Sequence, residues 1–443
     1  MPDPDAPVTG AATPATSAGW QHRLPFFYGY LIVAIAFVLA FANAGQLWAF
    51  SVLAVPMEND LGWSRSFLFG MLTLRGITAG AIAPFLGRMA DSDRGVRALV
   101  TASCVVGALS AYLCGQVTDQ WTFALLFGLL GGVSMAGQGF IMGAVVVPKW
   151  FIRRRSTMVA FTSMGGACSL LVLPPLVSAM EAATGWRSVW TMLAVLSVVI
   201  GLLPPLLIRR QPEDLGMHPD GDTTVSVQAR RDAGQQEVAV TLRTALRNRN
   251  LWLLMVGTAL GTIPMTSLTV TLVPIFLDRG IAPDLAALGL SGFGLASVGS
   301  RGGWGPLGDR FHIRRVLMVI ALVSAAGTVS IFGLTGLWVL SYGALTGFGI
   351  GGYVGLFQAV WGAYYGRAHL GAIAGVTQPL VTLCNASGSF LLAYIRDATG
   401  SYDAGLWLYS GVWLTCGLLL FAAKPAGHQP PGVAGAGLSA TPR

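Results

Sequence analysis

Long apolar runs separated by short polar stretches dominate the pattern of this 443-residue chain. Residues 31–53, 98–115 and 123–147 are nearly free of charge, and about 20 apolar residues suffice for a helix to cross a bilayer core. The pattern predicts an all-α integral membrane protein with twelve transmembrane helices. The predicted spans are 27–54, 66–87, 98–116, 121–147, 157–180, 188–208, 251–277, 285–308, 316–335, 337–363, 370–395 and 404–423.

One long polar segment, residues 209–250, divides the spans into six and six. Gly87–Asp91 recurs as Gly305–Asp309, 218 residues later, and Ala183–Gly185 recurs as Ala398–Gly400, 215 residues later. Duplicated six-helix units are typical of secondary transporters. We therefore expect two pseudo-symmetric six-helix bundles. The expected divisions are a disordered cytoplasmic tail (1–26), an N-terminal bundle (27–208), a cytoplasmic linker (209–250), a C-terminal bundle (251–424) and a second cytoplasmic tail (425–443).

Composition and charge support a membrane location. Hydrophobic residues make up 54% of the chain and charged residues only 10%, which excludes an ordinary soluble protein. With the N-terminus in the cytoplasm, 21 of the 27 Lys and Arg residues fall in cytoplasmic segments. Only Arg65, Arg187, Arg279 and Arg396 fall outside. This bias predicts a plasma (inner) membrane protein with both termini cytoplasmic, in contact with lipid and without a nucleic-acid partner.

The chain carries no sign of enzymatic chemistry. It contains no G-x-x-x-x-G-K-[ST] phosphate loop and no His or Cys residues at metal-ligand spacing. The five cysteines fall within predicted spans, where they serve as small packing residues. We expect no enzymatic activity, no cofactor and no metal.

The repeated Gly-x-x-x-Asp motif ends spans two and eight. An acid at the end of a helix can pair with nearby arginines or with the terminus of a neighbouring helix. The motif and its basic residues thus form candidate gating pairs: Asp91 with Arg94, and Asp309 with Arg310. The pattern resembles the signature of the major facilitator superfamily, which implies two bundles that rock around a central cavity.

Further motifs resemble one branch of that superfamily, the monocarboxylate transporters and oxalate/formate exchangers. These are Tyr28–Tyr30, Lys149–Phe151 followed by Arg153–Arg155, and Arg301 four residues before the span-eight motif. The resemblance implies that Arg301 receives a substrate carboxylate. The chain departs from the branch at Ser297 and near Trp48, where many monocarboxylate carriers have an aspartate and a lysine. Span eleven also lacks the lysine of oxalate exchangers, and these departures weaken the case for proton relay and for a dianion.

Two cations lie inside predicted spans, Arg75 and Arg301, while every Asp, Glu and His falls in a predicted loop or tail. A guanidinium at mid-membrane costs about 3 kcal/mol or more. Either it faces water and an anionic guest, or it bonds to helix carbonyls. For Arg301 the alternatives are a substrate ligand and a structural or gating arginine. Arg75 either shares the substrate or holds a neighbouring helix.

Polar and aromatic stripes supply the other candidate ligands. Asn43 and Gln46 share one face of span one, and Gln378, Thr382, Asn385 and Ser389 share one face of span eleven. Tyr353, Phe357, Trp361 and Tyr364 form an aromatic face of span ten. Helix packing is the alternative role for each stripe. The candidate substrate-binding set is Arg301, Arg75, Asn43, Gln46, Ser297, Tyr353, Phe357, Gln378 and Asn385.

The hypothesis that joins these features is a monomeric secondary active or facilitative transporter of a small organic anion, preferably a monocarboxylate, working by alternating access. A proton is a candidate co-substrate, carried with the anion or by a loop acid such as Glu58 or Asp60. Symport, uniport and exchange stay open. The alternatives are efflux of an amphiphilic or anionic drug-like compound, and a membrane sensor or scaffold that transports nothing.

Overall fold

A computed structural model describes residues 24–201, 207–222, 240–333 and 338–424, and these residues form helices joined by short turns. The N-terminal bundle contains α1 (Tyr28–Leu61), α2 (Arg65–Ala90), α3 (Asp93–Cys114), α7 (Arg155–Thr184) and α8 (Trp186–Gly201). Its fourth rod is a continuous series of five short pieces: α4 (Gln120–Phe123), η2 (Ala124–Leu130), α5 (Gly131–Met135), η3 (Ala136–Val146) and α6 (Val147–Trp150). Both η2 and η3 have π-helical hydrogen bonding.

The C-terminal bundle repeats this arrangement. It contains α12 (Arg249–Asp278), α13 (Pro283–Arg310), α14 (Ile313–Ser330), α15 (Trp338–Leu356), α16 (Ala359–Tyr365), α17 (Leu370–Thr399) and α18 (Asp403–Ala422), with a short turn η6 (Ile331–Gly333) after α14. Between the bundles lie η4 (Pro212–Leu215), η5 (Pro219–Gly221) and α11 (Leu242–Leu246). The predicted fold class is confirmed: the chain has the twelve-helix architecture of two six-helix bundles.

Nine helices in the described residues are long and apolar enough to cross a membrane, and α8 is a shorter apolar helix. The two long helices outside that set are α13 and α17, with 28 and 30 residues. They contain the glycines, hydroxyls and amides of the predicted motifs, which lower their mean hydropathy. The helices that are least apolar are therefore those with the predicted functional residues.

The expectation that all acids lie in loops is wrong. Helix α1 continues to Leu61 and ends at Gly62, whose φ of 68° stops the helix. Glu58 and Asp60 are consequently in the last turns of α1, and Glu181 and Asp309 lie within α7 and α13. Helices continue past the end of an apolar run until a turn residue stops them, so hydropathy alone ends them too early.

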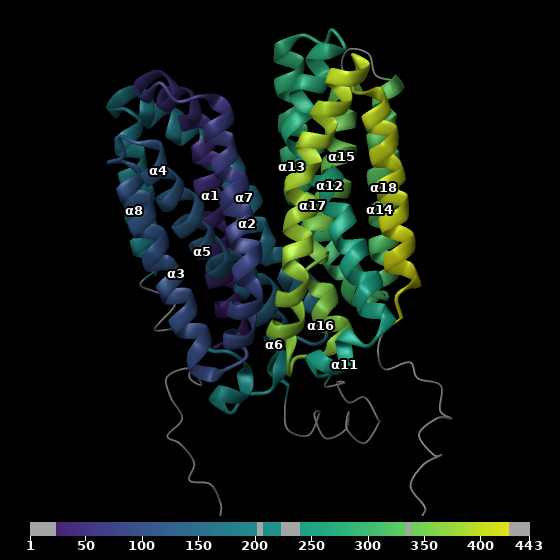
Figure 1. The fold of residues 1–443 in the computed structure, drawn as a ribbon. Coiled ribbons are helices and arrows are strands. Elements are labelled where there is room, and N and C mark those ends of the chain that lie inside the picture. Colours follow the sequence, from purple (N-terminus) through teal and green to yellow (C-terminus); the bar gives the residue numbers. More distant parts are fainter. Residues whose placement is uncertain (1–23, 202–206, 223–239, 334–337, 425–443) are drawn as a thin grey trace, which may run out of the picture.

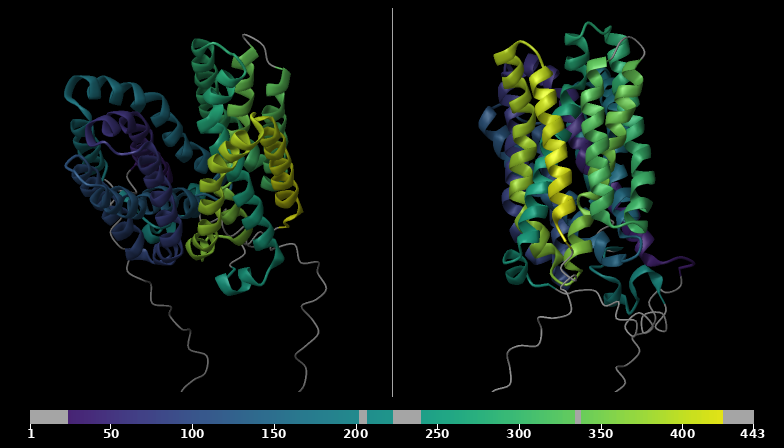
Figure 2. Two further views of the ribbon diagram at one scale, coloured as in Figure 1. Left: turned by 45° about the horizontal axis from the view of Figure 1, so that its top comes forward. Right: turned by 90° about the vertical axis from the view of Figure 1, so that its right-hand side faces the viewer.

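The two bundles lie side by side and have distinct ends (Figure 1). We call the end where α1 begins and α18 finishes the tail end, and the opposite one the far end. The bundles converge at the tail end and diverge toward the far end, and the tilted view shows them as separate bodies (Figure 2). Residues that join the bundles are therefore expected at the tail end.

Candidate functional site

Two seams join the bundles, α2 with α17 and α7 with α13. In the first seam, Asp91 at the end of α2 accepts hydrogen bonds from the backbone amides of Gly371 (3.1 Å) and Ala372 (3.0 Å). These amides are in the first turn of α17, where four N–H groups lack helical partners. A carboxylate at a helix N-terminus also interacts favourably with the helix dipole. Asp91 thus caps a helix of the opposite bundle.

The second seam repeats this contact in the other direction. Asp309 near the end of α13 accepts hydrogen bonds from the backbone amides of Ser156 (2.7 Å) and Thr157 (3.0 Å), in the first turn of α7. We call the two capped contacts together the latch. The sequence left two partners open for these acids, arginines or a helix terminus, and the structure has the helix termini.

Glycines let the backbones meet beside the latch. A Cβ added to Gly371 would lie 2.1 Å from the carbonyl oxygen of Gly87, and one added to Gly305 would lie 2.9 Å from the Cα of Thr157. Only glycine fits such contacts without a shift of the backbone. The glycine of each repeated motif therefore sets the close approach, and the aspartate caps the helix that this approach brings near.

Three cations at the tail end were missed by the sequence analysis as gating residues. Lys149, with 1% of its side chain exposed, places Nζ 2.7 Å from Asp91. Arg155 donates to the carbonyl of Gly362 in the opposite bundle, and Arg367 donates to the carbonyl of Lys149 at 3.0 Å. A cation within the apolar run before Trp150 was the available signal for Lys149. The latch is therefore reinforced by cations across the bundles.

The predicted partners of the two acids are placed differently. The side chain of Arg94 lies outside the described residues. Arg310 lies over the ring of Phe311, 6.0 Å from its centroid, and forms no ion pair with another residue that the structure describes. The structure thus does not bring Arg310 to Asp309 in this conformation.

Residues 207–222, which we call the strap, run beneath the latch. Glu213 pairs with Arg367 of the C-terminal bundle at 2.9 Å, while Arg210 donates to the backbone oxygen of Asp91 at 2.9 Å. Asp220 accepts from the amides of Ile152 (3.1 Å) and Arg153 (3.0 Å). The strap therefore contacts both bundles at the tail end.

Arg301 lies on α13, two turns from the latch, and is 5% exposed. Its Nη1 donates to the carbonyl and, at 3.0 Å, to the hydroxyl of Ser297. Its Nε donates to the hydroxyl of Ser163 on α7 at 3.0 Å. Within the described part of the chain, no carboxylate lies within ion-pair distance of this guanidinium. Arg301 is thus a buried cation on a seam between the bundles, bonded to neutral oxygens.

Arg75, 4% exposed, lies inside the N-terminal bundle instead. Its Nη2 donates to Gln46 Oε1 at 2.7 Å, and Gln46 Nε2 donates to Ser197 of α8 at 3.2 Å. The guanidinium stacks over Phe127, 4.9 Å from the ring centroid. The structure therefore brings together the predicted pair Arg75 and Gln46, but as a network within one bundle and apart from Arg301.

Most of the remaining candidates are bonded within their own bundle. Asn43 donates to the carbonyl of Met135 at 3.3 Å, and Asn385 donates to Thr266. Tyr353 is fully buried, donates to the carbonyl of Thr258 at 2.7 Å and stacks on the half-buried Phe357. These contacts agree with the packing alternative for the aromatic face.

Gln378 is the exception among the polar candidates. It is half-buried and forms no hydrogen bond with another described residue. It lies between Gly375 and Thr382 on the face of α17 that meets α2. In the repeat, its offset from the start of α17 matches that of Ser163 from the start of α7, since 378 and 163 differ by the same 215 residues. Gln378 and Ser163 are thus equivalent positions on the two seams.

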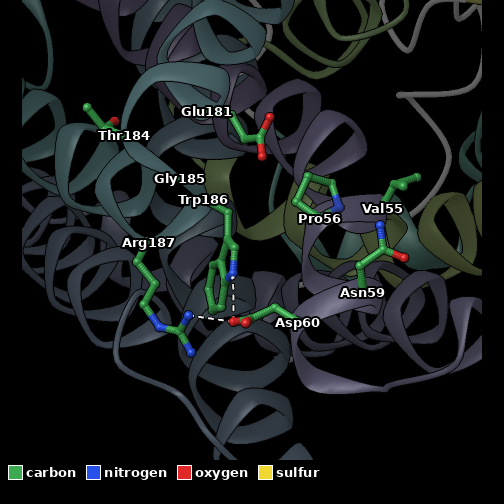
Figure 3. Close-up of a pocket in the computed structure, with 9 residues that line it drawn as sticks. All are labelled: Val55, Pro56, Asn59, Asp60, Glu181, Thr184, Gly185, Trp186 and Arg187. Atoms are coloured by element: carbon green, nitrogen blue, oxygen red, sulfur yellow. Dashed lines mark hydrogen bonds and ion pairs between the residues drawn. The ribbon is translucent and has the colours of Figure 1, made fainter.

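An open pocket of about 580 Å³ lies at the far end of the N-terminal bundle, between α1, α7 and α8 (Figure 3). Asp60 there accepts from Arg187 at 2.5 Å and from the indole nitrogen of Trp186 at 3.1 Å, while Glu181 points into the same space (Figure 3). None of the predicted substrate ligands lines this pocket. Asp60 lies far along α1 from Gln46, so the pocket is separate from the buried arginines.

Two helical bundles, paired by reciprocal caps at one end and holding a buried cation between them, define a membrane carrier. The family model of the Major Facilitator Superfamily matches residues 36–388, and the chain belongs to that superfamily. It is a multi-pass membrane transporter of small solutes.

The relatives are distant and cover nearly the whole chain. The uncharacterised MFS-type transporter YcxA of Bacillus subtilis is 23% identical and covers 89% of this chain and 91% of its own. Monocarboxylate transporter 12-B of Danio rerio is 24% identical and covers 89% and 87%. The solved structure of the proton:xylose symporter XylE superposes with a TM-score of 0.70 at 15% identity, over 89% of this chain and 95% of that one. The last similarity concerns the fold alone.

Proposed function

We propose that this carrier moves a small organic anion, preferably a monocarboxylate, and that Arg301 binds its carboxylate. The observation that carries the proposal is a guanidinium buried between the bundles whose bonds go to neutral oxygens only, within the described residues. An anion would supply the missing countercharge. A planar guanidinium fork also matches the two oxygens of a carboxylate. The similarity to a monocarboxylate transporter supports the same substrate class.

The second buried arginine has a different role in this proposal. Arg75 is bonded to Gln46 and stacked on Phe127, so it holds α1, α2 and the fourth rod together. Gln378 takes its place as the second polar group toward the substrate, because it lies on a seam and its amide is free of bonds to the described residues. An amide can donate to a keto or hydroxyl oxygen of a substituted acid.

We place the tail end in the cytoplasm of the plasma membrane, with the monomer as the transport unit. The arginines predicted to be external and described with side chains, Arg187, Arg279 and Arg396, lie at the far end and pair with Asp60, Asp403 and Asp278. The unpaired excess of basic residues is thus left to the tail end, as the positive-inside rule requires. In this orientation the conformation is closed toward the cytoplasm.

The test is uptake into proteoliposomes of labelled acetate, L-lactate, pyruvate and benzoate, with and without a pH gradient. The wild type should take up at least one acid saturably. Arg301→Ala should lower that uptake about 100-fold, and Arg301→Lys about tenfold, because the lysine keeps the charge and loses the fork. The matched control is Arg396→Ala, which removes an exposed guanidinium at the far end.

Two results would refute the assignment. The first is wild-type protein that moves none of the acids, which would return the drug-efflux and sensor alternatives. The second is normal uptake by Arg301→Ala at equal membrane levels. The gradient distinguishes coupling modes: stimulation by an inward proton gradient indicates symport, and stimulation by an unlabelled acid inside the vesicle indicates exchange.

A further inference from the structure

The bonds of Arg301 come from two helices that belong to opposite bundles. Ser297 is on α13, the helix of Arg301 itself, four residues earlier. Ser163 is on α7 of the N-terminal bundle. Rocking of the bundles leaves the first contact unchanged, since both residues move with one helix, but it must stretch or break the second. The hydrogen bond to Ser163 is therefore sensitive to conformation.

The hydroxyl of Ser163 can only accept from Arg301. A serine hydroxyl has one proton, and that of Ser163 is donated to the carbonyl of Ala160 at 2.8 Å. Its free lone pair then points to Nε of Arg301 at 3.0 Å. An oxygen acceptor thus sits on the guanidinium edge where a carboxylate oxygen would bind.

The guanidinium offers two edges to a carboxylate, Nε with Nη2 and Nη1 with Nη2. Nη1 is already bonded to the carbonyl and hydroxyl of Ser297, on the same rigid helix. None of the bonds of Arg301 uses Nη2. The edge that can be vacated is therefore Nε with Nη2, and vacating it means replacing Ser163.

The Ser163 contact is one of a series along the α7–α13 seam. Toward the tail end, Asp309 caps α7 and Gly305 meets Thr157. Toward the far end, a Cβ on Gly294 would lie 3.2 Å from Leu171. Loss of the bond from Arg301 to Ser163 removes a polar tie from the middle of this seam. The seam is then held by the cap and by apolar contacts.

The other seam has no such tie. The repeat offset of 218 places Ala83 where the second half has Arg301, and the offset of 215 places Gln378 where the first half has Ser163. Ala83 packs against Gly375 at this level. An anion that binds Arg301 therefore acts on the α7–α13 seam and leaves the α2–α17 seam as it was.

We infer that Ser163 is a positioning residue that takes the place of the substrate carboxylate on the Nε edge of Arg301 in the empty carrier, and that substrate binding releases this tie between the bundles. This inference rests on the proposed function. Occupancy and opening are linked because the same N–H group cannot serve Ser163 and the anion at once. The empty carrier is held closed at the tail end, and the loaded carrier has one bond fewer to break.

The experiment measures the distance between the bundles at the tail end. Spin labels are placed at Arg88 and His312, which are exposed and lie on opposite bundles, in protein whose native cysteines are replaced by alanine. Distance distributions are recorded without solute and with a mixture of acetate, L-lactate, pyruvate and benzoate. The variants are Ser163→Ala, Ser163→Thr, which keeps a hydroxyl, and Ser169→Ala as the matched control. Ser169 is on α7, is buried and donates to its own i−3 carbonyl at 2.8 Å, like Ser163, but has no bond to the other bundle.

Without solute, Ser163→Ala should populate the longer distance about three- to tenfold more than the wild type, because one hydrogen bond to a charged group is missing. The acid mixture should shift the wild type and Ser163→Thr, and shift Ser163→Ala much less. The KM for the transported acid should fall about threefold or more in Ser163→Ala, since the anion no longer competes with the hydroxyl. A purely structural loss would not lower KM.

An unchanged solute-free distribution in Ser163→Ala, or an equal shift in Ser169→Ala, would overturn the inference. A higher KM in Ser163→Ala would do the same. Failure of the proposed function is recognised separately: the wild type would take up none of the four acids and the mixture would shift no variant, while the solute-free effect of Ser163→Ala would persist and support the tie itself.

Discussion

Asp91 and Asp309 cap each other's bundles: each carboxylate leaves its own half and accepts two backbone amides from the first turn of a helix in the other half. The two caps differ in one respect. Lys149 lies 2.7 Å from Asp91, whereas no cation that the structure describes is within ion-pair distance of Asp309. The latch is thus symmetric in its hydrogen bonds and asymmetric in its charge.

This asymmetry predicts unequal effects of the same substitution. Asp91→Asn leaves Lys149, with 1% of its side chain exposed, as an unpaired buried charge. The expected cost is about 3 to 5 kcal/mol. Asp309→Asn keeps an acceptor and loses only charge at a helix terminus, with an expected cost of about 1 to 2 kcal/mol. Thermal unfolding of the detergent-solubilised variants measures the difference.

Lys149→Met supplies the control for that prediction. Combined with Asp91→Asn it removes the unpaired charge, so the double variant should be more stable than Asp91→Asn alone. Equal stability of Asp91→Asn and Asp309→Asn would mean that Lys149 does not depend on Asp91.

The Arg75 network predicts a stability effect without an effect on substrate affinity. Arg75→Leu removes the donor to Gln46 Oε1 and the cation over Phe127. We expect a loss of about 1 to 3 kcal/mol from the unpaired amide and the lost stacking. The KM for the transported acid should stay unchanged, in contrast to Arg301→Lys. A KM that rises in Arg75→Leu would assign this arginine to the substrate.

Gly371 predicts a conformational effect. A Cβ at this position meets the carbonyl oxygen of Gly87 at 2.1 Å, which is backbone and cannot rotate away. Gly371→Ala should therefore prevent full closure at the tail end and lengthen the distance between labels at Arg88 and His312. Gly299→Ala is the control, because an added Cβ there meets nothing within 4 Å. An unaltered distance in Gly371→Ala would show that the bundles close without this contact.

The sequence predicted the fold because each span leaves an apolar run of sufficient length, and the duplicated motif identified the acids of the latch. It did not predict the partners of Asp91 and Asp309. Backbone amides carry no sequence signal, and the capping helix begins more than 150 residues away in each case. For Lys149 and Arg155 the sequence contained the cations but not the pairing across bundles.

The buried arginines were found for a similar reason and separated only by the structure. Arg75 and Arg301 are equally unusual in an apolar sequence, and both are almost fully buried. What distinguishes them is the neighbour, Gln46 within one bundle or Ser163 across two. Such a difference depends on which helix faces are adjacent, and helical periodicity describes only the faces of a single helix.

The reciprocal caps have the geometry of an isologous contact, in which one surface meets its own equivalent through a two-fold axis. Any ligand that bound to equivalent residues of both halves would bind twice or lie on that axis. Arg301 has only Ala83 as its equivalent in the first half, so its positive charge lies off the axis. A fused pair of repeats can therefore keep a symmetric closing mechanism while recognising a single, polar-ended solute in one orientation.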